Sequence, residues 1–179
     1  QLAQLHGSGI EIIVVTSGAV AAGIHRLKLS KTRKDVPFRQ TLAAIGQGDL
    51  MQLYSRLFDS HDIVVAQTLL TRQDLSNRIG YLNARNTLLS LLSLHIVPIV
   101  NENDVVAVEE LEGTTIGDND NLSALVANLV DAQLLAILTD TGGLHTANPR
   151  TDPSAQLIPK VDLIDDAIEN LAEAKPVTS

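Results

Sequence analysis

Two clusters of amides and carboxylates stand out as groups that could bind a small charged ligand. Residues 101–104 read Asn-Glu-Asn-Asp, and residues 118–121 read Asp-Asn-Asp-Asn. A helix start or a turn needs only one such side chain to satisfy a backbone N–H group. Capping therefore accounts for part of each cluster. The remaining oxygens suit a ligand that carries an ammonium group, and Asp118 or Asp120 could also meet Mg²⁺ through waters or a bound nucleotide.

Two other polar segments are weaker evidence for a ligand-binding site. Ser17 follows an apolar run, and it is either a helix N-cap or part of a helix start that binds an anion. Gly18 and Gly23 have the glycine spacing of a P-loop, but an Ile-His pair stands where that motif needs Lys and Ser or Thr. This excludes a Walker site. Residues 139–143, Thr-Asp-Thr-Gly-Gly, are typical of a turn.

Short apolar runs and amphipathic stretches alternate along the chain. The runs are rich in β-branched residues or leucine and are continuous rather than alternating, which predicts strands buried on both faces. We expect strands at residues 10–15, 63–70, 96–100 and 134–138, and helices at residues 19–27, 38–58, 75–94 and 122–130. This order predicts an α/β fold with a mainly parallel open sheet and helices on both faces.

The polar segments follow the predicted strands directly. In open α/β sheets, ligands bind outside the carboxyl ends of the strands. We therefore expect the segments that begin at Thr16, Thr71, Asn101 and Thr139 to gather at one edge of the sheet and form a binding crevice there.

Composition narrows the class of ligand. The chain has 179 residues, the length of one domain, and 45% of them are hydrophobic. A formal net charge of −8 and an aromatic content of 2% argue against a nucleic-acid surface, which needs basic patches and stacking rings. No cysteine is present, which fits a reducing cytoplasm, and no run is long enough to span a membrane. A small-molecule ligand is expected, without a nucleic-acid or membrane partner.

Five segments together resemble the kinase domain of the glutamate 5-kinases, a branch of the amino acid kinase family. They read TSGAVAAG, LLTRQDLSNRIGYLNARNTL, VPIVNENDVVAV, GDNDNLSALVANLVDA and LLAILTDTGGLHTANPR. They occur in the order of that family, and the resemblance covers nearly the whole chain, from Gln1 to about residue 167. The resemblance implies the αβα sandwich of the amino acid kinases.

The resemblance also implies an activity: ATP-dependent phosphorylation of the side-chain carboxylate of L-glutamate, the first step toward proline. Asp118 and Asp120 would lie beside the reacting carboxylate and organise the substrate and Mg²⁺. Ser17, Asp104 and Asn119 would bind glutamate, whereas Thr139 and Asp140 would contact ATP. The resemblance further implies that the protein forms a homodimer or tetramer, with proline as a possible feedback inhibitor.

The family's two phosphate-binding lysines fall outside this chain. One lies on a first strand that would precede Gln1, and the other in a Gly-rich segment that would follow Ser179. We therefore expect residues 1–179 to be an amino acid kinase domain that is incomplete at both ends and inactive by itself. Two alternatives stay open: another amino acid kinase, acting on N-acetylglutamate, aspartate or a nucleoside monophosphate, or a degenerate non-catalytic domain that senses an amino acid.

Overall fold

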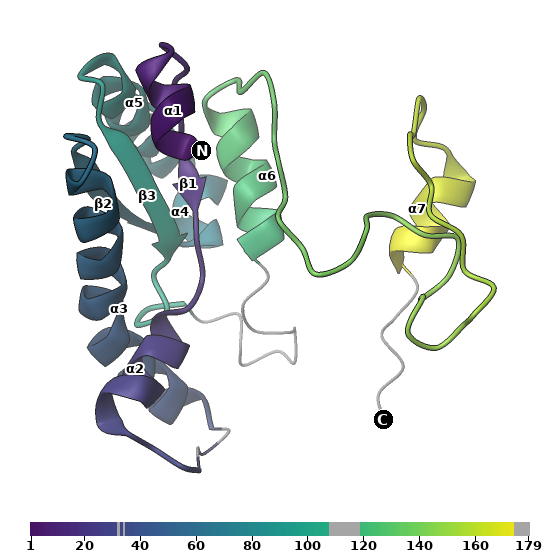
Figure 1. Ribbon diagram of the computed structural model, residues 1–179, viewed down its shortest axis with the longest axis horizontal. Helices are drawn as coiled ribbons and strands as arrows, with labels where there is room; N and C mark the ends of the chain where they lie inside the picture. Colours follow the sequence, from purple (N-terminus) through teal and green to yellow (C-terminus); the bar gives the residue numbers. More distant parts are fainter. Residues whose placement is uncertain (32, 34, 108–118, 174–179) are drawn as a thin grey trace. The chain divides into compact units, whose positions relative to one another are not determined.

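The computed structural model describes residues 1–31, 33, 35–107 and 119–173, which form two compact units, residues 1–135 and residues 136–179. The first unit contains a parallel sheet and its helices (Figure 1). Its elements are α1 (Leu2–Gly7), β1 (Val14–Val15), α2 (Ala19–Leu27), α3 (Val36–Asp59), β2 (Val65–Leu70), α4 (Arg72–Ser76), α5 (Arg78–Ser93), β3 (Val97–Glu102) and α6 (Asn119–Leu129). The predicted α/β class is confirmed.

The sheet has the strand order β1-β3-β2, and both pairings are parallel. Val14 of β1 pairs with Ile99 of β3, and Val65 of β2 pairs with Val97. The central strand β3 is buried from Val97 to Asn101, as expected for a strand that is covered on both faces. All three strands therefore point their carboxyl ends toward the same edge.

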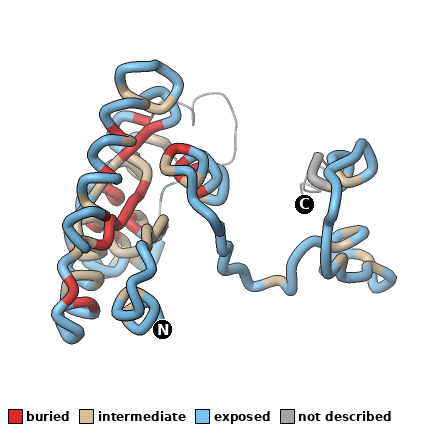
Figure 2. Tube along the Cα trace, turned by 90° about the horizontal axis from the view of Figure 1, so that it is seen from above, coloured by how far each residue is buried: buried red, intermediate tan, exposed pale blue. Residues whose placement is uncertain are grey.

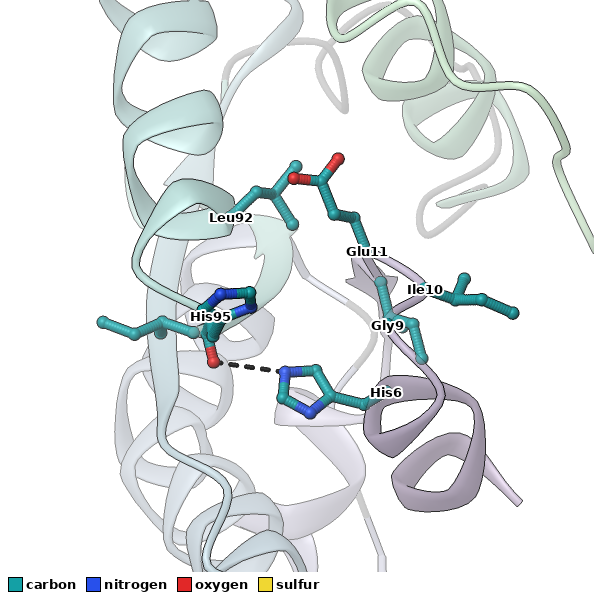
Figure 3. A pocket seen from close by; sticks show the side chains of 8 residues that line it. His6, Gly9, Ile10, Glu11, Leu92 and His95 are labelled. Atoms are coloured by element: carbon teal, nitrogen blue, oxygen red, sulfur yellow. Dashed lines mark hydrogen bonds between the residues drawn. The ribbon is translucent and has the colours of Figure 1, made fainter.

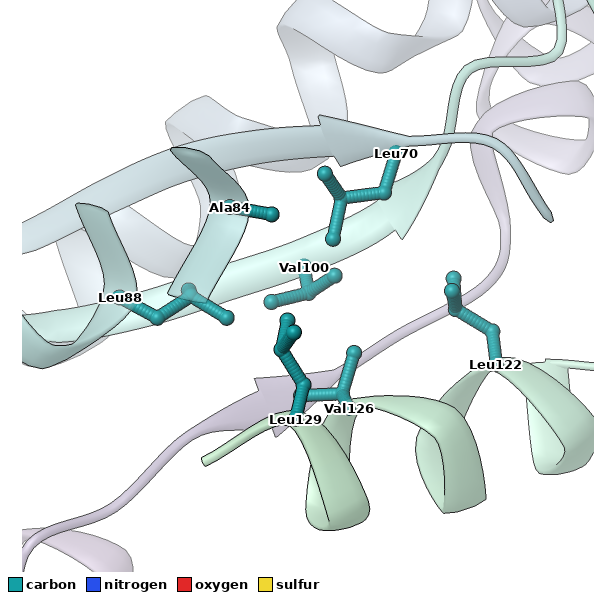
Figure 4. Close-up of a cluster of buried hydrophobic side chains, with 7 residues drawn as sticks. All are labelled: Leu70, Ala84, Leu88, Val100, Leu122, Val126 and Leu129. Atoms are coloured by element: carbon teal, nitrogen blue, oxygen red, sulfur yellow. The ribbon is translucent and has the colours of Figure 1, made fainter. Parts of the chain in front are cut away.

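Helices cover the two faces of the sheet. On one face Val100 packs with Leu88 of α5 and Leu129 of α6 (Figure 4). On the other face Val97 and Ile99 pack with Phe58 of α3. Successive residues of β3 point to opposite faces, so one strand contributes to both clusters.

Local capping explains where two of the helices begin. The Asp35 carboxylate accepts a hydrogen bond from the Phe38 backbone nitrogen at 3.2 Å, and Pro37 stands in the first turn of α3, where a missing N–H costs nothing. The helix predicted over residues 75–94 is in fact two, α4 and α5. It divides at Asn77, whose extended backbone ends α4 and whose side chain accepts from the Gly80 nitrogen at 2.7 Å to cap α5.

The predicted strand at residues 134–138 is wrong. A strand forms only where neighbouring backbone supplies hydrogen bonds, and these residues pair with no strand in the described part of the chain. Leu134 and Leu138 are 82% and 97% exposed, so the apolar run has no covering layer in this structure.

The second unit holds α7 (Asp166–Glu173) and an antiparallel bridge between His145 and Leu157. The Thr146 nitrogen donates to the Gln156 carbonyl at 2.9 Å, and the Ile158 nitrogen donates to the Leu144 carbonyl at 2.7 Å. Between residues 136 and 171 each residue is exposed or half-buried (Figure 2). Backbone hydrogen bonds therefore define this unit more than a buried core does.

Candidate functional site

Buried polar side chains gather at the carboxyl ends of β1 and β3. Thr16, directly after β1, is 8% exposed, and Asn101, near the end of β3, is 2% exposed. The Thr16 backbone nitrogen donates to the Val100 carbonyl at 2.9 Å, which continues the pairing of the two strands to this point. The Thr16 hydroxyl is within hydrogen-bond distance of the Ser17 carbonyl, at 3.1 Å, and of the Tyr54 hydroxyl, at 2.7 Å.

Three amide side chains form a hydrogen-bonded chain at this edge. Asn101 Nδ2 donates to Gln47 Oε1 at 2.9 Å, and Asn119 Nδ2 donates to Asn101 Oδ1 at 3.1 Å. Asn119 Nδ2 also donates to the Thr16 carbonyl. The amide chain Gln47–Asn101–Asn119 thus links α3, β3 and the first residue of α6.

Each end of the amide chain carries one atom without a hydrogen-bond partner. These atoms are the donor Gln47 Nε2 and the acceptor Asn119 Oδ1, both shielded from solvent and both unpaired in the described structure. Most buried polar atoms in proteins are satisfied, so an orphaned one calls for an explanation such as an absent ligand. The acceptor at Asn119 offers a place for a ligand N–H group.

Close packing of α2 on α3 positions Gln47. A Cβ atom on Gly46 would stand 2.0 Å from the Ala19 carbonyl oxygen, and one on Gly23 would stand 2.0 Å from the Leu42 carbonyl oxygen. Only glycine fits such contacts, so the two helices touch backbone to backbone. The residue after Gly46 is held next to the start of α2 as a result.

Ser17 lies exposed between β1 and α2, beside this cluster. Of the two alternatives for Ser17, the helix N-cap is wrong: Gly18 is the N-cap of α2, and no side chain makes the capping hydrogen bond. Gly18 has φ +111°, a left-handed conformation that glycine adopts without strain. The Ser17 side chain is therefore not committed to the helix end.

The acidic residues divide between the loop after β3 and the start of α6. Asp104 is half-buried in a turn in which the Val106 and Ala107 nitrogens donate to the Asn103 carbonyl at 3.1 and 3.0 Å. Asp120 is exposed in the first turn of α6. Asp118 lies outside the described residues. Asp104, Asn119 and Asp120 thus belong to the first unit, together with Ser17.

The two residues expected to contact ATP belong to the second unit. The Thr139 hydroxyl lies 3.3 Å from the Thr141 hydroxyl, and the Asp140 carboxylate forms an ion pair with Arg150. Both side chains are exposed. The segment is irregular, with bends at Asp140, Thr141 and Gly143.

Sequence reasoning assigned no role to Gln47 or Tyr54, although a signal was present. Residues 43, 47, 51, 54 and 58 follow one another at helical spacing and, apart from Gln47, are hydrophobic or aromatic. A glutamine in the core-facing stripe of α3 indicates a buried hydrogen-bond partner. That partner is Asn101.

A small hollow lies at the opposite end of the strands (Figure 3). It has room for about one water, roughly 10 Å³. His6 Nε2 donates to the His95 carbonyl at 3.1 Å across it. Because the hollow lies before β1 and β3 rather than after them, it is not where a sheet of this type binds ligands.

Within residues 1–107 and 119–173, apart from 32 and 34, no three His, Cys, Asp or Glu side chains are grouped so that they could hold a metal ion. In the same part of the chain, no helix combines the length and apolar character needed to cross a bilayer.

Comparison with known proteins gives a consistent family. The amino acid kinase family matches residues 1–176. A glutamate 5-kinase of Dehalococcoides mccartyi is 56% identical over 172 residues, and one of Herpetosiphon aurantiacus is 54% identical over 174 residues. A glutamate 5-kinase of Haemophilus influenzae is 50% identical over 172 residues.

These relatives are longer than the chain. The matches cover 96%, 97% and 96% of this chain, but only 46% of each relative, so the chain spans less than half of their length. The family match, by contrast, extends over almost every residue of the chain. With its parallel sheet, its flanking helices and this match, the chain belongs to the amino acid kinase family.

Proposed function

We propose that this chain is the amino-acid-binding part of a kinase that uses ATP to phosphorylate the side-chain carboxylate of L-glutamate, giving L-glutamyl 5-phosphate, the first step of proline biosynthesis. Relatives that are 50–56% identical over nearly the whole chain are named glutamate 5-kinases. One observation at the site supports the proposal. Asn119, which the family resemblance assigns to glutamate, presents an unpaired acceptor at the end of the amide chain.

Hydrogen-bond chemistry favours an amino acid with a free ammonium group. An ammonium is a donor only, so it needs oxygen acceptors, ideally with negative charge nearby. Asn119 supplies such an oxygen, and Asp104 supplies a carboxylate on the loop after β3. An acetylated amine carries no charge and keeps one N–H group, so it would gain much less from these acceptors.

ATP is the proposed phosphoryl donor, with Thr139 and Asp140 as its contacts. Phosphoryl transfer spreads negative charge over the oxygens of the moving group, so cationic groups are needed to stabilise it. Mg²⁺ keeps several waters and phosphate oxygens as ligands and needs only one or two carboxylates from the protein. Asp120 fits that limited role because it is exposed in the first turn of α6, and Asp118 is proposed to act with it.

Three further parts of the proposal come from the family resemblance. Proline is proposed as a feedback inhibitor, the protein as a homodimer or tetramer, and the cytoplasm as its location. Addition of proline to the kinase assay and sedimentation of the purified protein test the first two.

The function is tested with the complete polypeptide that carries this chain. ADP release is measured with ATP, Mg²⁺ and either L-glutamate, N-acetyl-L-glutamate or L-aspartate. We expect turnover with glutamate and none with the acetylated compound. In a parallel titration, Asp104→Ala should abolish glutamate binding, whereas Asp59→Ala, at the far end of α3, should leave it unchanged.

Two results would overturn the proposal. One is turnover with N-acetylglutamate or aspartate in place of glutamate, which would keep the kinase but change its substrate. The other is glutamate binding that does not depend on Asp104, which would move the ammonium site away from the loop after β3.

A further inference from the structure

The orientation of the Asn101 side chain is fixed by the backbone. Its Oδ1 accepts a hydrogen bond from the Glu102 nitrogen at 2.9 Å. Its Nδ2 must therefore face away from that nitrogen, where it donates to Gln47 Oε1 at 2.9 Å. Because Asn101 is almost completely buried, no bulk water competes for this position.

The orientation of Asn119 follows from that of Asn101. Its Nδ2 donates to two acceptors, the Thr16 carbonyl and Asn101 Oδ1. A reversed amide would set oxygen against oxygen at both contacts. Asn119 Oδ1 is consequently the atom that is left over, and it is the unpaired acceptor at the site.

Gln47 stabilises the orientation of Asn101 by accepting its Nδ2 hydrogen bond. If Gln47 had no acceptor at the Oε1 position, Asn101 Nδ2 would be a buried donor without a partner. The Asn101 side chain would then be stabilised by rotating to find another one. Rotation would withdraw Asn101 Oδ1 from Asn119 and remove one of the two contacts that orient it. The other amide atom of Gln47, Nε2, makes no hydrogen bond in the described structure.

We infer that Gln47 is a positioning residue for the substrate ammonium. Through Asn101 it determines that Asn119 offers an oxygen, rather than an N–H group, to the ligand. The inference rests on the proposed function, because the ligand is taken to be an amino acid with a free ammonium. It assigns the role to Oε1 of Gln47 and none to Nε2.

Two substitutions test the oxygen and the nitrogen of the Gln47 amide separately. Gln47→Met keeps the length of the side chain but removes the acceptor, whereas Gln47→Glu keeps an acceptor oxygen and removes the N–H donor. In the complete polypeptide, Gln47→Met should raise KM for glutamate about tenfold, equivalent to about 1.4 kcal/mol. Its kcat and its KM for ATP should change by less than about twofold. Gln47→Glu should restore KM to within about threefold of the wild type, and Gln52→Met, on the exposed face of α3, serves as the control.

A double-mutant cycle tests whether Gln47 acts through Asn119. Combined with Asn119→Ala, Gln47→Met should add no further increase in the glutamate dissociation constant, because the atom that it positions is gone. A residue that only supports the fold would instead add its own factor. Thermal denaturation of each variant verifies folding, and Gln47→Glu keeps the test decisive even if Gln47→Met does not fold.

Three results would overturn the inference alone: an unchanged glutamate KM in Gln47→Met, a tenfold higher KM in Gln47→Glu, or additive effects in the cycle. The second would move the role to Nε2 and to direct contact with a substrate carboxylate. If the unmodified protein did not phosphorylate or bind glutamate at all, the proposed function would fail, and this inference would fail with it.

Discussion

Gly46 of α3 lies against the backbone of Gly23 in α2, so closely that a Cβ atom on Gly46 would stand 2.2 Å from the Gly23 nitrogen. The same atom would stand 2.0 Å from the Ala19 carbonyl oxygen. Backbone atoms cannot swing aside as a flexible side chain can. This contact fixes how near α3 comes to the start of α2, and therefore where Gln47 meets Asn101.

Replacing Gly46 with alanine should separate the two helices. Overpacking of a tight site costs about 1–3 kcal/mol and occasionally more, and we expect Gly46→Ala to lower the free energy of unfolding by about 3 kcal/mol. Gly48, in the same helix, has nothing within 4 Å of the position that a Cβ atom would take, so Gly48→Ala should raise stability by about 0.5–1 kcal/mol through helix propensity. Urea denaturation of both variants is the measurement, and equal effects would contradict the close contact.

Most of the sheet could be predicted from the sequence because its strands are continuous apolar runs. The predicted strand at residues 96–100 contains most of β3, which is buried on both faces. The run at residues 134–138 is also a continuous apolar run but forms no strand. The sequence shows how apolar a segment is, whereas strand formation also requires a neighbouring strand that supplies hydrogen bonds.

The site was predicted only in part. The cluster at residues 101–104 and Asn119 were recognised from their types alone. Gln47 was not, because its role depends on a contact between residues 54 positions apart, set by the packing of α2 on α3. Ser17 was expected as a possible cap, but the positive φ of Gly18 gives that position to the glycine.

The apolar run at residues 134–138 should behave as surface in the 179-residue chain. Leu134 and Leu138 are 82% and 97% exposed, so replacing both with lysine should change the free energy of unfolding by less than about 0.5 kcal/mol. The same change should reduce self-association, because exposed apolar patches promote it. Leu129→Ala, at a fully buried position, should by contrast cost about 2–5 kcal/mol. Chemical denaturation measures the stability of both variants, and light scattering measures self-association. A large loss of stability in the lysine variant would show that the run is covered.

Asp152 should make stability depend on pH in the acid range. Hydrogen bonds from the Ser154 hydroxyl and then from the Ser154 backbone nitrogen, at 2.6 and 2.8 Å, lower the pKa of the Asp152 carboxyl below its usual 3.8. Because the folded pKa is lowered, the stabilisation is complete above the unfolded pKa and is lost as the pH falls through the folded pKa. Ser154→Ala should raise the pKa of Asp152 toward its usual value and should destabilise the protein at pH 7 but not at strongly acid pH. Carboxyl NMR titration measures the shift, and an unchanged titration in the variant would contradict the assignment.

Arg85 should hold the end of α6 against α5. Its guanidinium donates to the Leu129 carbonyl at the last residue of α6 and pairs with the Asp131 carboxylate at 2.6 Å. The carbonyl is at a helix end and would otherwise lack a partner, so Arg85→Met should lower the free energy of unfolding by about 1.5–3 kcal/mol, the usual value for a hydrogen bond to a charged group. The side chain of Asp131 is 77% exposed, so Asp131→Asn should cost less than about 1 kcal/mol. Guanidinium denaturation compares the two. If Asp131→Asn were as damaging as Arg85→Met, the contribution of Arg85 would come from the surface ion pair rather than from the carbonyl at the end of α6.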